Sequence, residues 1–469
     1  MTAAAAAPAT DVRSFCRGTP PLTARLEPWM AELLADPAAV DGLVPEGSPA
    51  NVHDAAPFAR NVAELRSAAA GRGVELGVFF ARKADKALAY VREARRVGAG
   101  VDVAGLEELR QTLAEGVGRV IVTAAVKTAA LVDESVAAGA TLSIDNADEL
   151  ARVRAAADRQ GRRALAALRL SGFEHGGRTL PSRFGFDVGE CLEAAGSLGR
   201  RVRLDGLHFH LDGYDAAQRA SAAHACLDLV PALREAGHPA AFLDIGGGVP
   251  MSYLDSAAEW AAFWEAVDDR PEEVTFDGTR YRRGDGRSCY PYHQSPTRAA
   301  WLEGLLDMPD AEGRGLAGRL RDLSVELRCE PGRSVLDGCG MTLARVEFRK
   351  ACPTSLHPLG GTLVGLAMNR TQCRTTSEDF LVDPLLVPCG GGRTAPTAGF
   401  LVGSYCMESE VLTKRRLEFP RGVGLGDVAA FPNTAGYLMH FLESRSHQFP
   451  LAPNLVRGAG WAADAVDAL

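Results

Sequence analysis

The sequence has no apolar run approaching the roughly 18 residues that suggest a membrane-spanning helix, so we expect no membrane partner. Its ten cysteines are scattered and form no CxxC pair, which argues against a zinc cluster and favours a reduced, cytoplasmic setting. It also lacks an excess of positive charge, because 51 Lys and Arg face 59 Asp and Glu, for a net charge of −8. That balance argues against a protein that coats nucleic acid.

What the sequence does have is the size and composition of a folded globular protein. It contains 469 residues, of which 46% are hydrophobic and 23% are charged, and this length predicts about two to four domains. Residues 1–20 begin Ala-rich, with neither a basic n-region nor a strong apolar core. We therefore predict a flexible N-terminal tail there rather than a signal peptide.

Short apolar, β-rich phrases alternate with stretches of helical period from about residue 74 to residue 330. The eight expected strands are residues 74–81, 100–104, 119–125, 141–145, 164–170, 206–211, 240–247 and 323–330. Helical stretches between them include residues 86–98, 106–116 and 216–237. This alternation indicates a parallel α/β architecture, and eight is the strand number of a closed (β/α)₈ barrel. A doubly wound open sheet is the alternative.

Two regions depart from this alternation. Residues 251–322 are too long for one crossover and are rich in Gly, Tyr and Arg around 274–296, so we predict an insertion at the edge of an active site. After Arg333 the apolar phrases become short and are separated by Gly and Pro. That pattern is typical of a second, mostly β domain.

Two features near predicted strand ends carry candidate chemistry. Lys83 stands in FFARKAD, just past the first strand, where a lysine can form a Schiff base with an aldehyde cofactor. A solvated lysine, such as the nearby Lys86, is the plainer interpretation. Residues 244–248, DIGGG, follow an apolar strand, and three glycines let backbone N–H groups approach a phosphate closely. A simple turn is the alternative there.

Two further features follow the sixth and eighth strands. In CEPGR, Glu330 can pair with a protonated ring nitrogen, and Arg333 can reach a phosphate. A Pro-Gly turn beside a surface ion pair would look the same. In GLHFHLDG, His208 and His210 lie two residues apart and therefore share one face of a strand. Either could stack on a planar ring, and the pair could also ligate a metal, but no third ligand stands at a convincing spacing, so we expect no metal.

The order of these motifs along the chain resembles that of the fold-type III pyridoxal-phosphate decarboxylases, the ornithine and diaminopimelate decarboxylase family. The resemblance covers roughly residues 55–450 and includes Lys83, residues 98–104, 182–185, His210, 244–248, 330–333, 403–406, 426–427 and 435–437. It implies an alanine-racemase-like barrel over residues 51–335, carrying the insertion, and a β domain over 336–469 that residues 21–50 join. It also implies a homodimer with active sites at the subunit interface.

The resemblance further implies roles for individual residues around pyridoxal 5'-phosphate. Lys83 would bind the cofactor covalently, His210 would stack on its ring, Glu330 would pair with its pyridinium nitrogen, and Asp102 would lie beside it. Cys406 from the partner subunit would protonate the substrate carbon after carbon dioxide leaves. The phosphate would be held by Gly246, Gly247, Gly248, Gly332, Arg333 and Tyr437.

Three positions depart from the family pattern. The family commonly has His-x-Gly-Ser after the sixth strand, whereas here Asp212 replaces the small residue and Gly213 replaces a phosphate-binding Ser. Met407 stands where the family commonly has an acid that reads a distal amine, with Glu408 next to it. Met407 makes a substrate with a plain distal amine less expected, and Arg370 with the Tyr- and Arg-rich insertion suggests a substrate bearing a second carboxylate or another acceptor group.

The expected function is removal of the α-carboxylate of an amino acid, or of a derivative free or tethered to a carrier, through an external aldimine and a quinonoid. Glu330 favours this over a racemase or epimerase of the same fold, because that branch commonly places an Arg at this position. A cofactor-binding homologue without turnover is the other alternative. Retention of Lys83, Glu330 and Cys406 argues against it.

Overall fold

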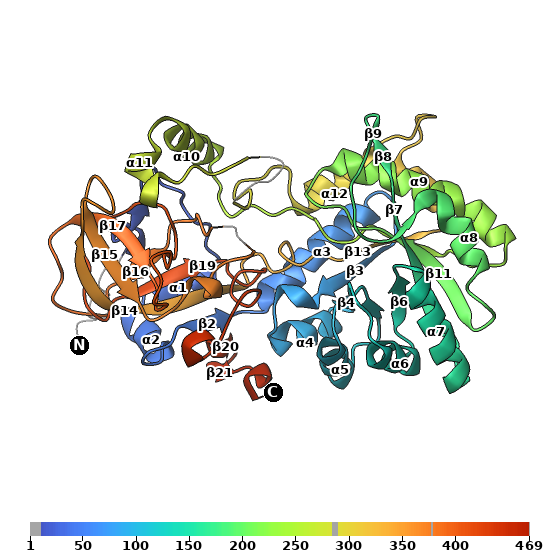
Figure 1. Ribbon diagram of the computed structural model, residues 1–469, viewed down its shortest axis with the longest axis horizontal. Coiled ribbons are helices and arrows are strands. Elements are labelled where there is room, and N and C mark those ends of the chain that lie inside the picture. Colours follow the sequence, from blue (N-terminus) through green and yellow to red (C-terminus); the bar gives the residue numbers. More distant parts are fainter. Residues whose placement is uncertain (1–10, 284–288, 377–378, 469) are drawn as a thin grey trace, which may run out of the picture. The chain divides into compact units, whose positions relative to one another are not determined.

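The computed structural model describes residues 11–283, 289–376 and 379–468. The chain forms two compact units, each built from separate stretches of sequence (Figure 1). Unit 1 comprises Met1–Ala55, Ser252–Gln294 and Leu336–Leu469, and unit 2 comprises Ala56–Met251 and Ser295–Val335. No helix in the described ranges is both long and apolar enough to cross a membrane.

Unit 2 is a closed barrel of eight parallel strands. These strands are β3 (Leu76–Ala81), β4 (Gly100–Val103), β5 (Val120–Val122), β6 (Thr141–Ile144), β7 (Ala164–Ser171), β11 (Val202–His208), β12 (Phe242–Asp244) and β13 (Glu326–Cys329). They pair in the order β7-β11-β12-β13-β3-β4-β5-β6, and β6 pairs with β7 to close the ring. The predicted (β/α)₈ barrel is therefore confirmed, and the open sheet is excluded.

Helices surround this barrel (Figure 1). They are α3 (Ala56–Ala70), α4 (Leu88–Arg96), α5 (Leu106–Ala114), α6 (Ala129–Ala138), α7 (Ala147–Gln160), α8 (Cys191–Gly196), α9 (Ala216–Glu235), α12 (Arg298–Asp307) and α13 (Leu316–Asp322). Local sequence sets their ends. For α7, the Asn146 side chain accepts a hydrogen bond from the Glu149 N–H, and Gly161 ends the helix in the left-handed conformation.

The loop after β7 is the most elaborate of the barrel loops. It contains a small hairpin of β8 (Glu174–His175) and β9 (Arg178–Thr179), then β10 (Phe186–Asp187), which adds beside β7. Short 3₁₀ turns follow β3 over Arg82–Ala84 and precede α8 over Val188–Glu190. Such loops at the carboxyl ends of barrel strands are where this fold places its functional residues.

Unit 1 consists mostly of strands. Its strands are β1 (Arg17–Gly18), β2 (Ala50–His53), β14 (Gly340–Cys352), β15 (Gly361–Leu366), β16 (Leu385–Val387), β17 (Thr397–Val402), β18 (Leu417–Phe419), β19 (Val428–Pro432), β20 (Asn454–Arg457) and β21 (Trp461–Ala463). Its helices are α1 (Pro28–Leu34), α2 (Pro37–Leu43), α10 (Ala257–Asp269) and α11 (Pro271–Val274). This confirms the mostly β second domain.

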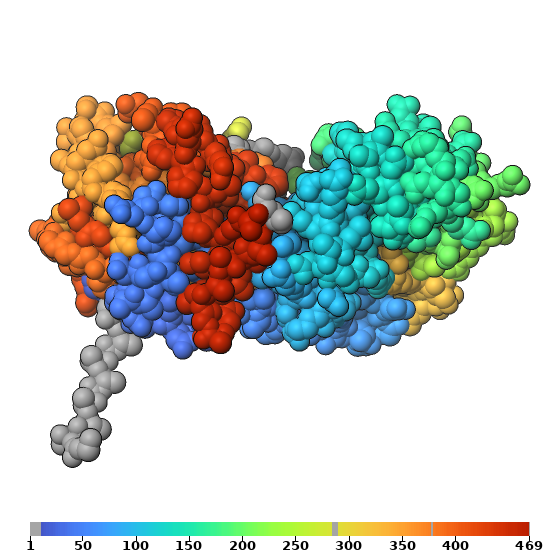
Figure 2. Space-filling view, turned by 90° about the horizontal axis from the view of Figure 1, so that it is seen from below, coloured from blue at the N-terminus to red at the C-terminus, as the bar shows by residue number. Residues whose placement is uncertain are grey.

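The long strand β14 organises unit 1, because it pairs with β2, β15 and β19. Met341 and Leu343 on β14 pack with Trp29 and Met30 of α1 in a buried hydrophobic cluster. Strand β20 pairs with β2, so segments from the N-terminal and C-terminal parts of the chain share one sheet. Figure 2 shows the N-terminal segment in blue beside the C-terminal segment in red.

Two segments differ from their predicted roles. Residues 1–10 of the expected tail lie outside the described residues, but residues 12–14 form a 3₁₀ turn and 17–18 form β1, because Val12, Phe15 and Cys16 are buried. The expected insertion at 251–322 has two parts, since 252–294 belong to unit 1 and 295–322 supply α12 and α13 of the barrel. In the first part, Tyr253, Tyr290 and Tyr292 are buried and pack edge to face against one another.

Candidate active site

A cavity of about 240 Å³ lies at the carboxyl ends of the barrel strands. Parallel strands bring these ends to one rim, so residues far apart in the sequence converge there. The lining residues are Lys83, Ala104, Thr123, Ala125, Arg169, Phe184, His208, His210 and Glu330. Four of them, namely Lys83, His208, His210 and Glu330, are candidates that the sequence identifies. The structure thus brings Lys83, His210 and Glu330, which stand after three different strands, into one space.

Lys83 lies in the 3₁₀ turn directly after β3, and its amine is held by Asp102. The Lys83 Nζ atom is 2.5 Å from Oδ2 of Asp102, a fully buried residue of β4. The hydroxyl of Thr123 donates to the other oxygen of Asp102 at 2.5 Å. The carboxylate therefore has a fixed orientation, with one oxygen facing the lysine amine and able to exchange a proton with it.

Glu330 is a buried carboxyl group with an unused acceptor. It is 3% exposed, and its Oε1 atom has no hydrogen-bond partner among the described residues. Burial raises the pKa of Glu330 well above its ordinary value, and the negative charges of Asp102 and Asp244 raise it further. Burial also raises the pKa of Asp244, to about 7. These surroundings therefore favour the protonated form of the Glu330 carboxyl group, which can share its proton with a ligand.

His208 is also buried, and its hydrogen bonding fixes its ring. Its Nδ1 lies 2.6 Å from the Ser143 hydroxyl, and its Nε2 lies 3.5 Å from Oε1 of Glu330. Burial lowers the pKa of His208 well below its ordinary value, and nearby positive charges, led by Arg169, lower it further. With Asp244 and Glu330, His208 forms a group whose potential metal-ligating atoms lie within 4.8 Å of one another. The same positive charges oppose a metal cation there.

The glycine-rich loop after β12 presents bare backbone to the rim. Gly246 and Gly248 have φ angles of 68° and 76°, which favour glycine. A Cβ atom at Gly247 would lie 3.0 Å from the Glu330 carbonyl oxygen. The Gly247 N–H donates to Nδ1 of His210 at 3.1 Å, so that imidazole is an acceptor at Nδ1. His210 is exposed, with its ring free to stand over a flat ligand in the cavity.

The sequence interpretation missed two residues that line this cavity, Arg169 and Thr123, and one residue bonded to its lining, Glu108. Arg169 is the sixth residue of β7, and its guanidinium lies 4.2 Å above the Phe184 ring. A charged residue near the carboxyl end of an otherwise apolar strand was the available signal for it. Thr123 follows β5 without such a signal. Glu108, near the start of α5, accepts the Ala104 N–H at 2.7 Å, and burial raises its pKa.

The remaining candidates are divided between the units. Gly332 and Arg333 follow β13 in unit 2, whereas Arg370, Cys406, Met407, Glu408 and Tyr437 belong to unit 1. Arg370 faces the loop that carries Cys406, because it donates to the Ser409 carbonyl at 3.0 Å and lies 3.5 Å from Glu410. Cys406, Met407 and Glu408 are exposed on that loop. Tyr437 follows β19 with a φ angle of 64°.

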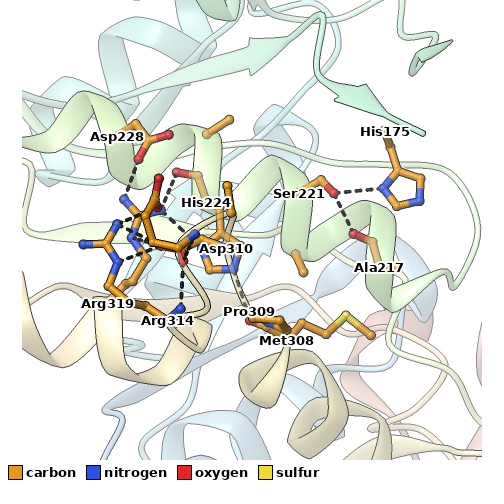
Figure 3. A pocket seen from close by; sticks show the side chains of 14 residues that line it. His175, Ala217, Ser221, His224, Asp228, Met308, Pro309, Asp310, Arg314 and Arg319 are labelled. Carbon is orange, nitrogen blue, oxygen red and sulfur yellow. Dashed lines mark hydrogen bonds and ion pairs between the residues drawn. The ribbon is translucent and has the colours of Figure 1, made fainter. Parts of the chain in front are cut away.

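A larger cavity, about 740 Å³, lies among the outer helices of unit 2 (Figure 3). There Arg319 of α13 contacts Asp228 at 2.5 Å and Asp310 at 3.5 Å. His224 of α9 lies 3.1 Å from the Met308 carbonyl. No lining residue of this cavity contributes a buried, unpartnered polar side-chain atom to the described structure. None of the candidate residues lies in it.

Comparisons with known proteins give a family and a fold. Residues 58–275 match the family described as pyridoxal-dependent decarboxylase, pyridoxal binding domain. Protein y4yA of Sinorhizobium fredii (strain NBRC 101917 / NGR234), described as uncharacterized, is 32% identical over 92% of this chain and 93% of its own length. A diaminopimelate decarboxylase of Neisseria meningitidis serogroup A is 26% identical over 72% of this chain and 73% of its own length.

Two solved structures illustrate the likeness of fold. Diaminopimelate decarboxylase from M. jannaschii, solved with L-lysine, has a TM-score of 0.68 and 18% identity over 91% of each chain. Lysine decarboxylase from Selenomonas ruminantium has a TM-score of 0.66 and 18% identity over 92% of this chain and 96% of its own. At this identity the likeness concerns the fold.

Proposed function

The chain belongs to the pyridoxal-dependent decarboxylase family, and we propose that it removes the α-carboxylate of an amino acid with pyridoxal phosphate as its cofactor. The observation that carries this proposal is the convergence of Lys83, Glu330 and the glycine-rich loop at one end of a closed barrel. A reactive amine, a buried acid and an anion-binding backbone are the groups that such a cofactor requires.

The unit 2 residues fit this cofactor on three separate grounds. Lys83 offers an amine at the rim. Glu330 has a buried oxygen without a partner, suited to a ring nitrogen. Side chains at Gly246–Gly248 would collide with neighbouring protein atoms, so this loop is bare backbone, and bare backbone N–H groups can contact a phosphate. Lys83 would hold the cofactor covalently, Glu330 would contact its ring, and the glycines would contact its phosphate.

When bound, pyridoxal phosphate supplies an electron sink for the carbon that loses carbon dioxide. Asp102 can accept a proton from Lys83 Nζ through its Oδ2, and this frees the amine for covalent attachment. Because the pKa of Glu330 is raised by burial, Glu330 can supply a proton to a ring nitrogen and remain paired with it as the carboxylate. A protonated ring favours decarboxylation over the racemase alternative.

We also propose that the active site is shared across a homodimer, with Cys406 donated by the partner subunit as a general acid. Its support is the exposed position of Cys406 on the loop after β17, together with the family resemblance. A one-to-one mixture of inactive Lys83→Ala and Cys406→Ala subunits should recover up to about one quarter of wild-type turnover, because half of randomly mixed dimers are mixed and hold one complete site. No recovery, with subunit exchange shown, contradicts the shared site.

The substrate is proposed to carry a second carboxylate or another acceptor group. Met407 offers no charge to a distal amine, and Arg370 places a guanidinium beside the same loop. Arg370 already contacts Ser409 and Glu410, so it can serve a substrate only by sharing or exchanging these contacts.

The decisive experiment is a panel of amino acids tested for carbon dioxide release and product mass. Decarboxylation predicts release of one carbon dioxide per product and a mass loss of the carboxyl group. A racemase would invert chirality without a mass change, and a binding protein without turnover would do neither. Lys83→Ala should abolish the release, while Lys86→Ala, three residues away and exposed, is the matched control.

A further inference from the structure

Arg219 and Arg415 are the largest fully buried side chains among the described residues. Arg219 lies in the first turn of α9, and its Nη2 atom donates to the carbonyl oxygens of Leu211 at 2.7 Å and Gly247 at 3.1 Å. Its Nε and Nη1 atoms have no hydrogen-bond partner in the described part of the chain. A buried guanidinium with two idle donors is costly unless an anion compensates it.

The position of Arg219 relates it to the glycine-rich loop. A Cβ atom at Gly248 would lie only 1.9 Å from Nη2 of Arg219 and 2.7 Å from the Gly213 carbonyl oxygen. Arg219 therefore lies directly behind the loop expected to contact a phosphate. The same Gly248 position lies against Gly213, where this chain lacks the family's phosphate-binding Ser.

The hydrogen bond to Gly247 orients the backbone. In a trans peptide the C=O and N–H point in opposite directions. Because Arg219 holds the Gly247 carbonyl, the N–H of Gly248 is turned away from Arg219, and no described residue accepts it. Arg219 thus aims one donor outward and places a positive charge behind it. A neutral side chain could anchor the carbonyl equally well, so the charge itself requires an explanation.

The described surroundings do not provide a direct carboxylate partner. Arg219 lies 5.7 Å from the centre of the Trp301 ring, and Asp212 and Asp215 are exposed. These two acids act on Arg219 only through longer-range attraction. Burial lowers the pKa of Arg219 to about 10, which leaves the side chain charged at neutral pH. By contrast, Arg319 of α13, nearly as buried, is paired with Asp228 (Figure 3).

We propose that Arg219 is a positioning residue for the phosphate of the cofactor, replacing the missing hydroxyl at Gly213 with a buried positive charge and an oriented Gly248 N–H. This inference rests on the proposed cofactor function. It assigns to this chain a phosphate site that works through Arg219 and the glycine-rich loop. The specific consequence is that Arg219 matters for ligands with a phosphate and not for the pyridoxal ring.

The test compares Arg219→Met with wild type, measuring the affinity of the apo-protein for pyridoxal phosphate, for pyridoxal and for inorganic phosphate by calorimetry and by visible absorption. We expect Arg219→Met to weaken binding of pyridoxal phosphate and of inorganic phosphate by about tenfold or more, with pyridoxal affinity unchanged. Arg219→Lys keeps the charge but not the fork of donors, so its affinities for the two phosphate ligands should lie between those of wild type and Arg219→Met. Arg319→Met is the matched control and should bind all three ligands as wild type does.

Each outcome decides the proposal. If Arg219→Met weakens pyridoxal and pyridoxal phosphate equally, Arg219 is a structural anchor and the proposal is wrong. If the affinities for pyridoxal and for pyridoxal phosphate are both unchanged, the proposal is also wrong. If Arg219→Met does not fold, the comparison passes to Arg219→Lys, and equal losses for the two ligands overturn the proposal. If wild type binds inorganic phosphate through Arg219 but never gains the visible band with pyridoxal phosphate, the proposed cofactor function fails and the phosphate site stands.

Discussion

Two cavities of unit 2, the one at the barrel mouth and the one among the outer helices, differ in how their polar groups are satisfied. At the barrel mouth, buried polar atoms of His208 and Glu330 lack hydrogen-bond partners among the described residues, and so do those of Asp244 and Arg219 just behind them. In the cavity among the outer helices, the corresponding groups bind one another, as Arg319 does with Asp228 (Figure 3). The outer cavity is the larger of the two, at about 740 Å³ against 240 Å³.

This difference indicates that unpaired buried groups identify a ligand site better than volume does. A folded protein normally satisfies its buried polar atoms, so a concentration of exceptions implies that something else completes them. In the outer cavity the pairs are complete and serve the fold. At the barrel mouth the buried groups without hydrogen-bond partners are the ones that a ligand would complete. Mutations at the barrel mouth should therefore affect the chemistry, and mutations in the outer cavity should affect the stability of the fold.

The largest effect should come from Lys83. Lys83→Ala removes the only amine that the described residues contribute to the barrel-mouth cavity, so the visible absorption band of the bound cofactor and nearly all turnover should be lost. The apo-protein should remain folded, because this side chain is partly exposed. Absorption spectra and carbon dioxide release measure both effects. Loss of the band in Lys86→Ala instead would shift the assignment to the neighbouring lysine.

Glu330 should show the next largest effect on rate. Glu330→Gln keeps the shape of the side chain but cannot hold the charge beside a ring nitrogen. Turnover should fall by on the order of 10²-fold or more, because a paired charge in a low-dielectric site is worth several kcal/mol to the transition state. Cofactor affinity should be nearly unchanged. An unaltered rate would exclude Glu330 from the chemistry.

Arg319 tests the other side of the comparison. Arg319→Met leaves Asp228 and Asp310 without this partner, and we expect a loss of roughly 1–2 kcal/mol of unfolding free energy. The estimate is modest because Asp228 is two-thirds exposed and Arg314 still contacts Asp310. Denaturant unfolding measures the loss, and turnover of the folded fraction should equal that of wild type. A loss of turnover without a loss of stability would contradict the view that the outer cavity serves the fold and the barrel mouth serves the chemistry.

The smallest expected effect is a change in the pH dependence of apo-protein stability. The pKa of Glu330 is raised in the folded state, so its contribution to stability is complete below its unfolded pKa and is lost as pH rises through the folded value. Glu330→Gln removes this loss. The variant's melting temperature should therefore gain on that of wild type as pH increases from about 5 to 8. Glu312→Gln, an exposed control at the outer cavity, should show no such trend.

Much of the fold was predictable from local sequence. The eight barrel strands follow from apolar phrases separated by helical stretches, and each observed strand overlaps a predicted one. Closure was not predictable from the pattern, since it depends on the pairing of β6 with β7 across the ring. Residues 252–294 were assigned to the barrel region because they interrupt it in sequence, but their buried tyrosines pack within unit 1.

The residues of the candidate site also divide into those predictable from the sequence and those that only the fold reveals. The sequence by itself determined which motifs stand after which strands, because Lys83, the glycine-rich loop and Glu330 are recognisable from their immediate neighbours. Only the tertiary structure decided that Arg169 enters the cavity, that Asp102 holds Lys83, and that Arg219 lies buried behind Gly248. The physical reason is that the burial of a residue and its pairing partners depend on which residues surround it in the folded structure. The sequence of a charged residue in a helix is the same whether its side chain faces water, a carboxylate or the site of a bound anion. Only the packing around that side chain distinguishes the three cases.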